Sequence, residues 1–362
     1  MKLSIITINY NNAEGLRKTL ASVAAQTYAN IEHIIVDGGS TDGSVEVIEA
    51  YASGVACTVS GCGIKDAVSA ADAAVNSQPA KGAQLREATQ PANGTLPAHS
   101  AHHQILWISE PDKGIYNAMN KGIEIALGKL GVTDDHHSIP LTSNLSPLTS
   151  SEYIQILNSG DILAAPDVTE RMISALLKQN AENSDNTASN LSPLTSNLQN
   201  RPAILYGNMI KVNAQGQVVG KSGYTEYSLR QFYHSTLNHD CAYIRRDLFE
   251  EYGLYDENLK IVSDWKWYLQ AIGLGRVKPE YVDIDVTIFD DGGISETNLV
   301  LRNAERRKVL EELLPPAVLW DYDTHAFEME QMKRLRRWHL YPLVYFIERV
   351  CFKLEKWFCK RK

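Results

Sequence analysis

The sequence predicts an α/β protein with a doubly wound, mostly parallel sheet and helices on both faces. Two observations carry this expectation. Apolar, β-branched runs alternate with stretches of helical periodicity, which is the pattern of a parallel sheet. Two of these runs, 33–36 and 153–157, end in polar loops that contain Asp37 and Asp161. Ligands of open α/β sheets bind at the carboxyl ends of strands, so these loops mark the expected site.

The N-terminal region predicts the order strand, helix, strand, helix. The first strand is expected over 3–9 and is followed by a helix with an apolar stripe. The second strand over 33–36 leads into the loop 37–42 and a second helix. Asp42 or Ser44 can cap that helix, because short polar side chains accept from free N–H groups at a helix start.

Three segments interrupt the alternation and are predicted to be low-complexity loop insertions, at about 52–103, 129–151 and 181–201. The first is rich in Ala, Ser, Gly and Pro and has few large apolar residues, so it cannot bury much surface. The other two share the string SNLSPLTS. The paired histidines at 102–103 and 136–137 lie inside insertions, and we expect no ordered scaffold to hold them around a metal.

The alternation continues between the insertions. The pattern predicts a strand over 105–108, a helix over 113–128, a strand over 153–157, a helix over 167–179 and a strand over 203–207. Without the insertions these elements follow one another directly. This indicates that the insertions lie at loop tips, where a fold tolerates added residues.

Charge divides the chain into an acidic body and a basic end. The formal net charge is −8, yet residues 333–362 carry ten Lys or Arg and only two Glu. The acidic body argues against a nucleic-acid partner. The basic end interleaves cations with Trp, Phe and aliphatic residues, which is typical of a helix lying on an anionic membrane surface. The alternative is a C-terminal helix that packs on the body or on a partner subunit.

Cysteine usage and the N-terminus favour a cytoplasmic setting. The five cysteines are odd in number and scattered, which argues against a disulfide framework. The run at 3–8 lacks the regions of a signal peptide, and no apolar stretch is long enough to span a bilayer. We therefore expect a cytoplasmic protein, peripheral at the inner face of the plasma membrane.

Five motifs resemble those of family 2 glycosyltransferases, which have the GT-A fold. They are Ser4–Asn11, Val36–Gly43, Ser109–Gly122, Leu157–Asp161 and Ile261–Trp265, in the order of the family. The resemblance implies a GT-A domain over 1–300 and a helical, basic, amphipathic tail over 301–362. It implies an inverting hexosyltransferase-type enzyme of the EC 2.4 class. The donor would be a nucleotide diphospho-sugar, most simply a UDP- or dTDP-sugar, and the acceptor a hydroxyl of a cell-surface glycan or lipid-linked glycan.

The resemblance also assigns donor-binding residues. Asp37 is expected to accept from the base, because an ionised carboxylate suits the imide N–H of uracil or thymine; its structural alternative is a turn residue. Asp112, Lys113 and Gly114 lie at a helix start, which favours phosphate charge, although Asp112 could simply be the N-cap. The remaining donor-binding candidates are Asn9, Tyr10 and His239.

Two further aspartates are expected to carry the chemistry. Asp161 ends the segment that matches the family's Asp-x-Asp metal motif, where Asn158 replaces the first carboxylate. Mg²⁺ or Mn²⁺ would then take its other ligands from the donor diphosphate. Asp264 matches the family's general base, and its alternative role is a helix N-cap. Asn117 stands where family members often have Asp, and the loop 289–295 resembles the family's glycine-containing loop, a candidate lid.

Two other functions fit parts of the sequence. A sugar nucleotidyltransferase of the same fold would carry a Gly-rich basic phosphate loop after the first strand, and the segment 9–12 is not such a loop. A non-catalytic scaffold that binds a sugar nucleotide or a membrane is consistent with the incomplete metal motif. Donor binding without turnover would distinguish the scaffold from an enzyme.

Overall fold

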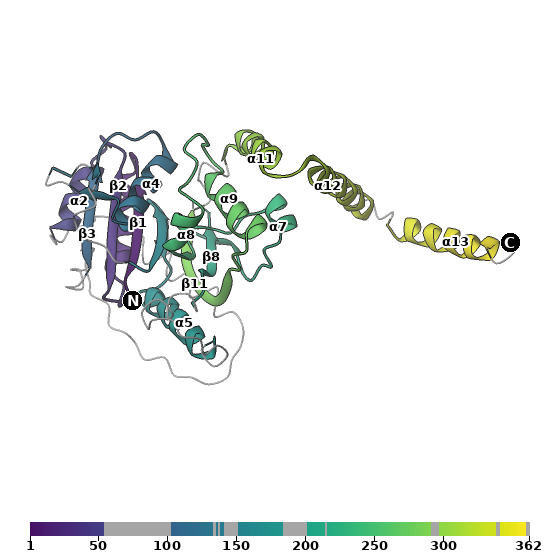
Figure 1. Cartoon of the computed structure of the whole chain (residues 1–362), viewed down its shortest axis with the longest axis horizontal. Helices are drawn as coiled ribbons and strands as arrows, with labels where there is room; N and C mark the ends of the chain where they lie inside the picture. Colours follow the sequence, from purple (N-terminus) through teal and green to yellow (C-terminus); the bar gives the residue numbers. More distant parts are fainter. Residues whose placement is uncertain are drawn as a thin grey trace. The chain divides into compact units, whose positions relative to one another are not determined.

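The structure is a computed structural model, and two compact units make it up, Met1–Asn303 and Ala304–Lys362. The residues that it describes are 1–53, 103–132, 135–136, 138–140, 151–183, 201–213, 216–290, 297–337 and 341–359. Most of the three expected insertions therefore lie outside the described residues. The first unit contains the sheet and the candidate site (Figure 1).

A mixed sheet forms the centre of the first unit. Its strands in the described chain are β1 Leu3–Asn9, β2 Ile31–Asp37, β3 Gln104–Ser109, β6 Tyr153–Asn158, β7 Ile162–Leu163, β8 Ile204–Val212, β9 Val218–Lys221, β10 Ala242–Arg245 and β11 Glu280–Asp290. The order across the sheet is β3-β2-β1-β6-β10-β8-β11-β7, with β9 paired to β8. The pairs β1–β2, β1–β6, β2–β3 and β8–β11 are parallel, whereas β10 is antiparallel to both neighbours. The α/β class is confirmed, but the sheet is mixed rather than mostly parallel, because β11–β7 and β8–β9 are antiparallel as well. The sequence pattern did not predict these antiparallel pairs.

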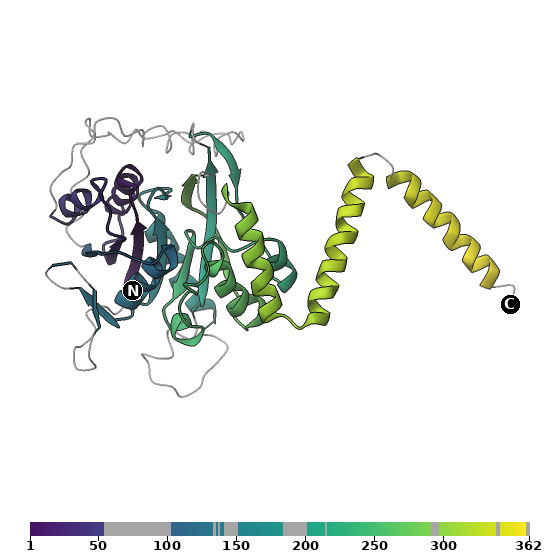
Figure 2. The same ribbon diagram turned by 90° about the horizontal axis from the view of Figure 1, so that it is seen from above.

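Helices cover both faces of this sheet (Figures 1 and 2). In the first unit they are α1 Ala13–Ala24, α2 Ser44–Ala52, α4 Ile115–Ala126, α5 Val168–Asn183, α7 Leu229–His234, α8 Asp247–Glu251 and α9 Ser263–Tyr268, which continues as the π-helix Leu269–Leu274. Ile35 packs in one core with α1 and α2, whereas its neighbour Val36 contacts α4 on the other face. All residues of β1 and β2 are buried, as expected for strands that are covered on both sides.

A short two-stranded sheet occupies part of the expected insertion over 129–151. It pairs β4, Leu130–Val132, with β5, Ser138–Pro140. Between them the ring of His136 stacks on Trp107, with centroids 3.6 Å apart, and the His136 carbonyl accepts from the Ser109 amide. The expectation that no ordered scaffold holds this histidine is therefore wrong, because the end of β3 fixes it.

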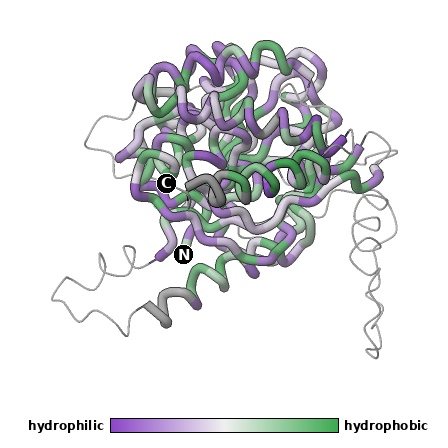
Figure 3. The backbone as a smooth tube through the Cα atoms, turned by 90° about the vertical axis from the view of Figure 1, so that its right-hand side faces the viewer, coloured by the Kyte–Doolittle hydropathy of each residue, from purple (hydrophilic) through white to green (hydrophobic). Residues whose placement is uncertain are grey.

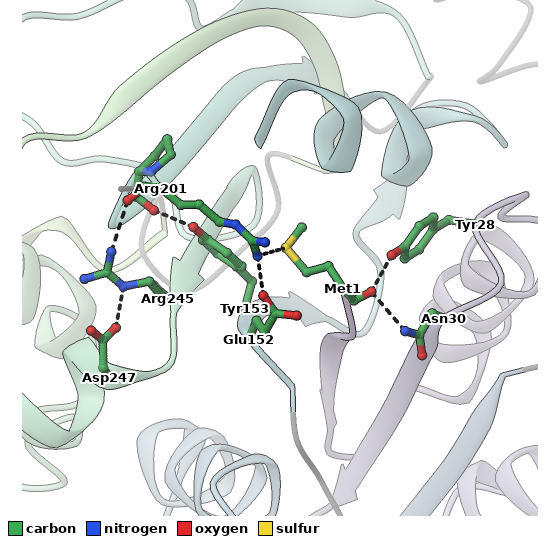
Figure 4. A network of polar contacts seen from close by, with 9 residues as sticks. Met1, Tyr28, Asn30, Glu152, Tyr153, Arg201, Arg245 and Asp247 are labelled. Atoms are coloured by element: carbon green, nitrogen blue, oxygen red, sulfur yellow. Dashed lines mark hydrogen bonds and ion pairs between the residues drawn. The ribbon is translucent and has the colours of Figure 1, made fainter. Parts of the chain in front are cut away.

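A polar network links the strand ends at the edge of the sheet opposite the carboxyl ends of β1 and β6 (Figure 4). Tyr153, the first residue of β6, donates to the Pro202 carbonyl at 2.6 Å. Arg245, the last residue of the antiparallel β10, donates to the carbonyl of Arg201 at 3.0 Å. Arg201 in turn pairs with Glu152. These contacts stabilise the edge that carries no candidate site residue.

The second unit consists of helices. It holds most of α11, Leu299–Leu313, and all of α12, Pro316–Arg337, and α13, Tyr341–Cys359. Arg307 on α11 binds Asp323 on α12 at 2.7 Å. Among the described helices, none is both long and apolar enough to cross a bilayer. Figure 3 shows hydrophobic turns along α13 beside the C-terminus. The large apolar side chains that α13 exposes are Leu343, Val344, Tyr345, Phe346, Ile347, Val350, Phe352 and Leu354.

Candidate active site at the carboxyl edge of the sheet

Two adjoining pockets lie where β1, β2 and β6 end. The first, which we call the Tyr10 pocket, has a volume of about 740 Å³ and is lined by Ile8, Asn9, Tyr10, Gly38, Gly39, Pro111, Asp112, Gly114, Ile115, Ala118, Asn158, Ser159 and Lys260. The second, the His239 pocket, has a volume of about 520 Å³ and is lined by Asn12, Glu14, Gly15, Lys18, Ile115, Tyr116, Met119, Asn158, Ser159, Gly160, Asp161, His239, Lys260, Ile261, Asp264 and Phe289. Because four residues line both pockets, one elongated ligand can occupy the two together.

Asp37 organises the loop after β2 but lines neither pocket. Its side chain is fully buried. Oδ1 accepts from Asn9 Nδ2 at 2.8 Å and from Ser40 Oγ at 2.6 Å. Oδ2 accepts from Ser109 Oγ at 2.8 Å and from the amides of Gly39 and Ser40. These donors fill the acceptor sites of a carboxylate. The geometry therefore favours the turn interpretation of Asp37 over direct contact with a base.

Asn9 and Tyr10, two of the predicted donor-binding residues, both line the Tyr10 pocket. Asn9 is the last residue of β1, and its side chain is held by Asp37. Tyr10 is 65% exposed, so its ring is open to a ligand. The next residue, Asn11, has a φ of +46° and accepts from the Thr41 amide, which ties the loop after β1 to the loop after β2.

Asp112 projects into the Tyr10 pocket against Gly38. Its Oδ1 accepts from the Gly114 amide at 2.8 Å. Its Oδ2 lies 2.5 Å from where a Cβ of residue 38 would be, and a ring carbon of Tyr10 lies 3.1 Å from the same point. Asp112 is not the N-cap of α4, because Gly114 holds that position with no side-chain cap. Unlike Asp37, Asp112 therefore presents a carboxylate in the pocket.

Lys113 differs from the expectation for a phosphate ligand. It is exposed and lines neither pocket, although Gly114 beside it lines the Tyr10 pocket. Its backbone amide donates to Asn117 Oδ1 at 3.2 Å. Asn117 also donates to Glu257 at 3.0 Å, so this residue has a structural partner in place of a ligand. Sequence reasoning missed two lysines of the site: Lys260, which lines both pockets, and Lys18, which lines the His239 pocket.

Asp161 lies in the His239 pocket and is held there by α1. Thr19 Oγ1 donates to the Asp161 carbonyl at 2.7 Å, and the carboxyl group is almost completely buried. Burial and the charge of Asp240 raise the pKa of Asp161 to about 8, although His239 and a hydrogen bond with Asn158 oppose that rise. Within the described chain, Asp161 Oδ2 has no hydrogen-bond partner.

This unpartnered oxygen fits a divalent cation, but only as one ligand among several. A hard cation needs about six oxygen ligands. The described residues contain no cluster of three or more His, Cys, Asp or Glu side chains that could hold a metal. Asp161 would therefore bind Mg²⁺ or Mn²⁺ together with oxygens of a bound ligand and water, which agrees with the loss of the first carboxylate at Asn158.

Asp264 lies in the first turn of α9, with contacts to both of its oxygens. The helix begins at Ser263 with Val262 as its N-cap, so the N-cap interpretation of Asp264 is wrong. Tyr116 donates from its hydroxyl to Oδ1 at 2.8 Å. His239 Nδ1 lies 3.5 Å from Oδ2. Burial raises the pKa of Asp264, but these contacts and the charge of His239 outweigh burial and hold that pKa below its usual value.

His239 connects the two aspartates of the pocket. Its Nε2 lies 3.2 Å from Asn158 Nδ2, at the end of β6. Burial lowers the pKa of His239, but its hydrogen bond with Asp264 and the charges of Asp264, Asp240 and Asp161 raise that pKa to about 9. The ring is then cationic at neutral pH and donates from both nitrogens, so the Asn158 amide would present its oxygen to Nε2.

The candidate lid is only partly described. Phe289 lines the His239 pocket, but residues 291–296 lie outside the described residues. Tyr116 is the residue of the site that sequence reasoning missed most clearly. It stands within the motif Ser109–Gly122, but nothing in its spacing indicates that it contacts a carboxylate 148 positions away.

Comparison with known proteins identifies glycosyltransferases that are similar to this chain. Residues 4–65 match the family model described as Glycosyl transferase family 2. An uncharacterized glycosyltransferase of Mycobacterium tuberculosis is 25% identical over 273 residues, which are 74% of this chain and 68% of the relative. A PGL/p-HBAD biosynthesis glycosyltransferase of Mycobacterium bovis is 20% identical over 295 residues, 81% of this chain and 79% of the relative.

A solved structure gives a weaker likeness. The crystal structure of S. aureus TarS 1–349 aligns with a TM-score of 0.46 and 14% sequence identity. The alignment covers 80% of this chain and 61% of the TarS chain.

Proposed function

We propose that this chain, which belongs to glycosyl transferase family 2, inverts the anomeric centre as it moves a sugar from a nucleotide diphospho-sugar to a hydroxyl acceptor. The observation that carries the proposal is the position of Asp264. Asp264 lines a pocket that shares four lining residues with a second pocket large enough for a nucleotide. A direct displacement needs such a base on the acceptor side of the sugar.

The two pockets suggest how the donor lies. The nucleoside would occupy the Tyr10 pocket, with its base against the exposed ring of Tyr10. The diphosphate would lie at the shared wall, to which Asn158 and Lys260 contribute. The sugar would then enter the His239 pocket beside Asp264. The donor of first choice remains a UDP- or dTDP-sugar, because Asp112 offers an acceptor to the imide N–H of either base.

The reaction proceeds by one displacement. The oxygen of the acceptor hydroxyl attacks the anomeric carbon, and Asp264 accepts the proton of that hydroxyl. The bond from that carbon to the diphosphate breaks on the opposite side, and the nucleoside diphosphate leaves with the bonding electrons. Lys260 is a cation in position to stabilise the charge of the leaving group. A divalent cation bound at Asp161 would supply further charge neutralisation to the same group.

We further propose that the tail 333–362 contacts an anionic membrane surface, at the inner face of the plasma membrane. Two observations support this proposal: the excess of Lys and Arg in the tail, and the apolar side chains that α13 exposes, with Phe346 at 65%. An interfacial helix combines these two properties. A lipid-linked glycan acceptor would benefit from such attachment. Co-sedimentation with vesicles of phosphatidylglycerol, compared with phosphatidylcholine, tests the proposal, and equal binding to both would contradict it.

Nucleotide release is the test of the enzymatic proposal. Purified protein is incubated with UDP-, dTDP- and GDP-sugars, with Mg²⁺ or Mn²⁺, and with membrane lipid extracts as acceptor source. We expect one donor to be consumed and Asp264→Asn to lower the rate by about 10²-fold or more, because that is the usual contribution of a general base. A donor that raises the melting temperature but is never consumed would favour the scaffold. When pyrophosphate is added, conversion of the nucleotide sugar to a nucleoside triphosphate and a sugar 1-phosphate would favour the nucleotidyltransferase.

A further inference from the structure

We propose that Tyr116 and His239 are positioning residues that hold the Asp264 carboxylate from two sides and leave Oδ2 as the oxygen that takes the acceptor proton. The inference rests on the proposed function, since it concerns the base of that reaction. It removes His239 from the donor-binding group and assigns Tyr116 a role that no sequence motif indicated.

Tyr116 is the rigid side of this arrangement. Its hydroxyl donates to Asp264 Oδ1 at 2.8 Å, and only 5% of the residue is exposed. Asn120, one turn later on α4, donates to the Tyr255 carbonyl and accepts from the Tyr255 amide, both at 2.9 Å. The ring of Tyr255 lies 5.8 Å from that of Tyr116. The start of α4 is therefore fixed to the segment that leads into α9, and the phenol cannot easily leave Oδ1.

His239 is the looser side. The distance from Nδ1 to Asp264 Oδ2 is 3.5 Å, long for a hydrogen bond between charged partners, which is usually below 3 Å. Its other nitrogen contacts Asn158, which lies at the end of β6 and lines both pockets. Contacts at both ring nitrogens thus keep the imidazole near Oδ2. The long distance leaves Oδ2 able to accept a further hydrogen bond.

The difference between the two contacts selects the reactive oxygen. Oδ1 accepts a short hydrogen bond from the phenol of Tyr116, which is buried and held in place by its helix. Oδ2 faces His239 at the longer distance of 3.5 Å and can accept from a hydroxyl that enters the His239 pocket. The backbone amide of Trp265 also bonds to this carboxylate. Without the bond from Tyr116, the carboxylate of Asp264 could rotate about its Cβ–Cγ bond. Oδ2 would then face the acceptor hydroxyl for only part of the time. Misplacement of a reacting group by about 1 Å can cost about 10²-fold in rate.

Donor binding connects to the same residue. Gly114 lines the Tyr10 pocket, and Tyr116 follows it by two positions at the start of α4. A donor bound at Gly114 would therefore contact the same helix start that carries the Tyr116 hydroxyl.

Tyr116→Phe is the decisive variant, since it removes one oxygen atom and keeps the ring. Tyr153→Phe is its matched control. Tyr153 is also buried, and its hydroxyl also makes a short bond, 2.6 Å to the Pro202 carbonyl, but at the opposite edge of the sheet. We expect Tyr116→Phe to lower kcat by about tenfold or more with the KM for the donor within about twofold. Tyr153→Phe should lower the melting temperature and leave kcat unchanged.

The pH profile and a double-mutant cycle separate positioning from a general loss of structure. Loss of a donor to Asp264 raises the pKa of its carboxyl, so the acid limb of kcat should move to higher pH in Tyr116→Phe. His239→Gln should lower kcat in the same way. In an Asp264→Asn background, Tyr116→Phe should have no further effect. An unchanged acid limb, or an equal loss of rate in both backgrounds, would overturn the inference.

A measurement without turnover distinguishes failure of the inference from failure of the proposed function. The carboxyl groups of aspartate are labelled with ¹³C and titrated by NMR, and the signal of Asp264 is assigned by its loss in Asp264→Asn. The pKa of that signal should rise in Tyr116→Phe and stay constant in Tyr153→Phe. A constant value in both variants would show that Tyr116 does not hold the carboxylate. If the value rises but no donor is consumed, the contact stands and the proposed function fails.

Discussion

The carboxylate of Asp112 occupies the space that the missing side chain of Gly38 leaves open. Oδ2 of Asp112 lies 2.5 Å from the ideal Cβ position of residue 38, closer than any real Cβ contact. The two residues come from the ends of different strands, β2 and β3, and meet in the Tyr10 pocket. Asp112 can take this position because residue 38 is glycine. The loop after β3 thus places the carboxylate of Asp112 in the pocket. Asp37 holds the end of β3 from within the fold, because it accepts from Ser109 Oγ.

Gly38→Ala should weaken nucleotide binding. The added methyl group would collide with Asp112 Oδ2 and approach the Tyr10 ring, so both pocket residues must move. We expect the Kd for UDP to rise by about tenfold, or about 1.4 kcal/mol, as measured by calorimetry. Gly220→Ala is the control, because its nearest neighbour would be Lys211 Cβ at 3.9 Å. A Kd that is unchanged in Gly38→Ala would show that Asp112 has no part in binding.

Substitutions at Asp112 and Asp37 should have different consequences. Asp112→Asn is expected to raise the Kd for UDP by about fivefold to tenfold with little change in stability, because one half-buried acceptor at the pocket is altered. Asp37→Asn is expected to lower the free energy of unfolding by about 1–3 kcal/mol, because an amide N–H₂ would face donors such as Ser109 Oγ inside the fold. Thermal unfolding with and without UDP measures both effects. If Asp37→Asn loses UDP binding while its stability is normal, the base contact belongs to Asp37.

The sequence predicted the parts of the site that follow directly from strand ends. Asp37 and Asp161 terminate apolar runs, and parallel strands bring their carboxyl ends to one edge, so their common location follows from the periodicity alone. The fold class was predictable for the same reason. The antiparallel direction of β10 was not, because a strand of four residues has the same apolar pattern in either direction.

Contacts between distant segments could not be read from spacing. Tyr116 and Asp264 are 148 positions apart, and the bond between them depends on how α4 and α9 pack over the sheet. The role of Asp37 could not be decided from the sequence, because a carboxylate after a strand is chemically suited both to a ligand and to a turn. Only the donors around it, such as Asn9 and Ser40, decide between the two.

Binding of Mn²⁺ should depend on pH through Asp161. Burial and the charge of Asp240 raise the pKa of this carboxyl to about 8, and a carboxyl group must lose its proton before it can bind a metal. The apparent affinity for Mn²⁺ in the presence of UDP should therefore rise by up to about tenfold per pH unit below pH 8 and level off above it. Electron paramagnetic resonance of free Mn²⁺ measures this affinity. In Asp161→Asn we expect weak binding without that pH dependence, and identical profiles would exclude Asp161 as the ligand.

The stability of the fold should fall as pH rises through the titration of His239. Burial lowers the pKa of this ring, but its bond with Asp264 and the three neighbouring carboxylates raise it to about 9, above the ordinary value of 6.5. A group with a raised pKa binds its proton more tightly in the folded state, so its contribution is complete below about pH 6.5 and is lost as pH approaches 9. We expect the free energy of unfolding of the wild type, relative to His239→Asn, to decline across this window in urea titrations. If the difference in free energy of unfolding between the wild type and His239→Asn is constant between pH 6 and 9.5, the His239 ring is neutral in the folded protein. Asp264 would then lack a cationic neighbour.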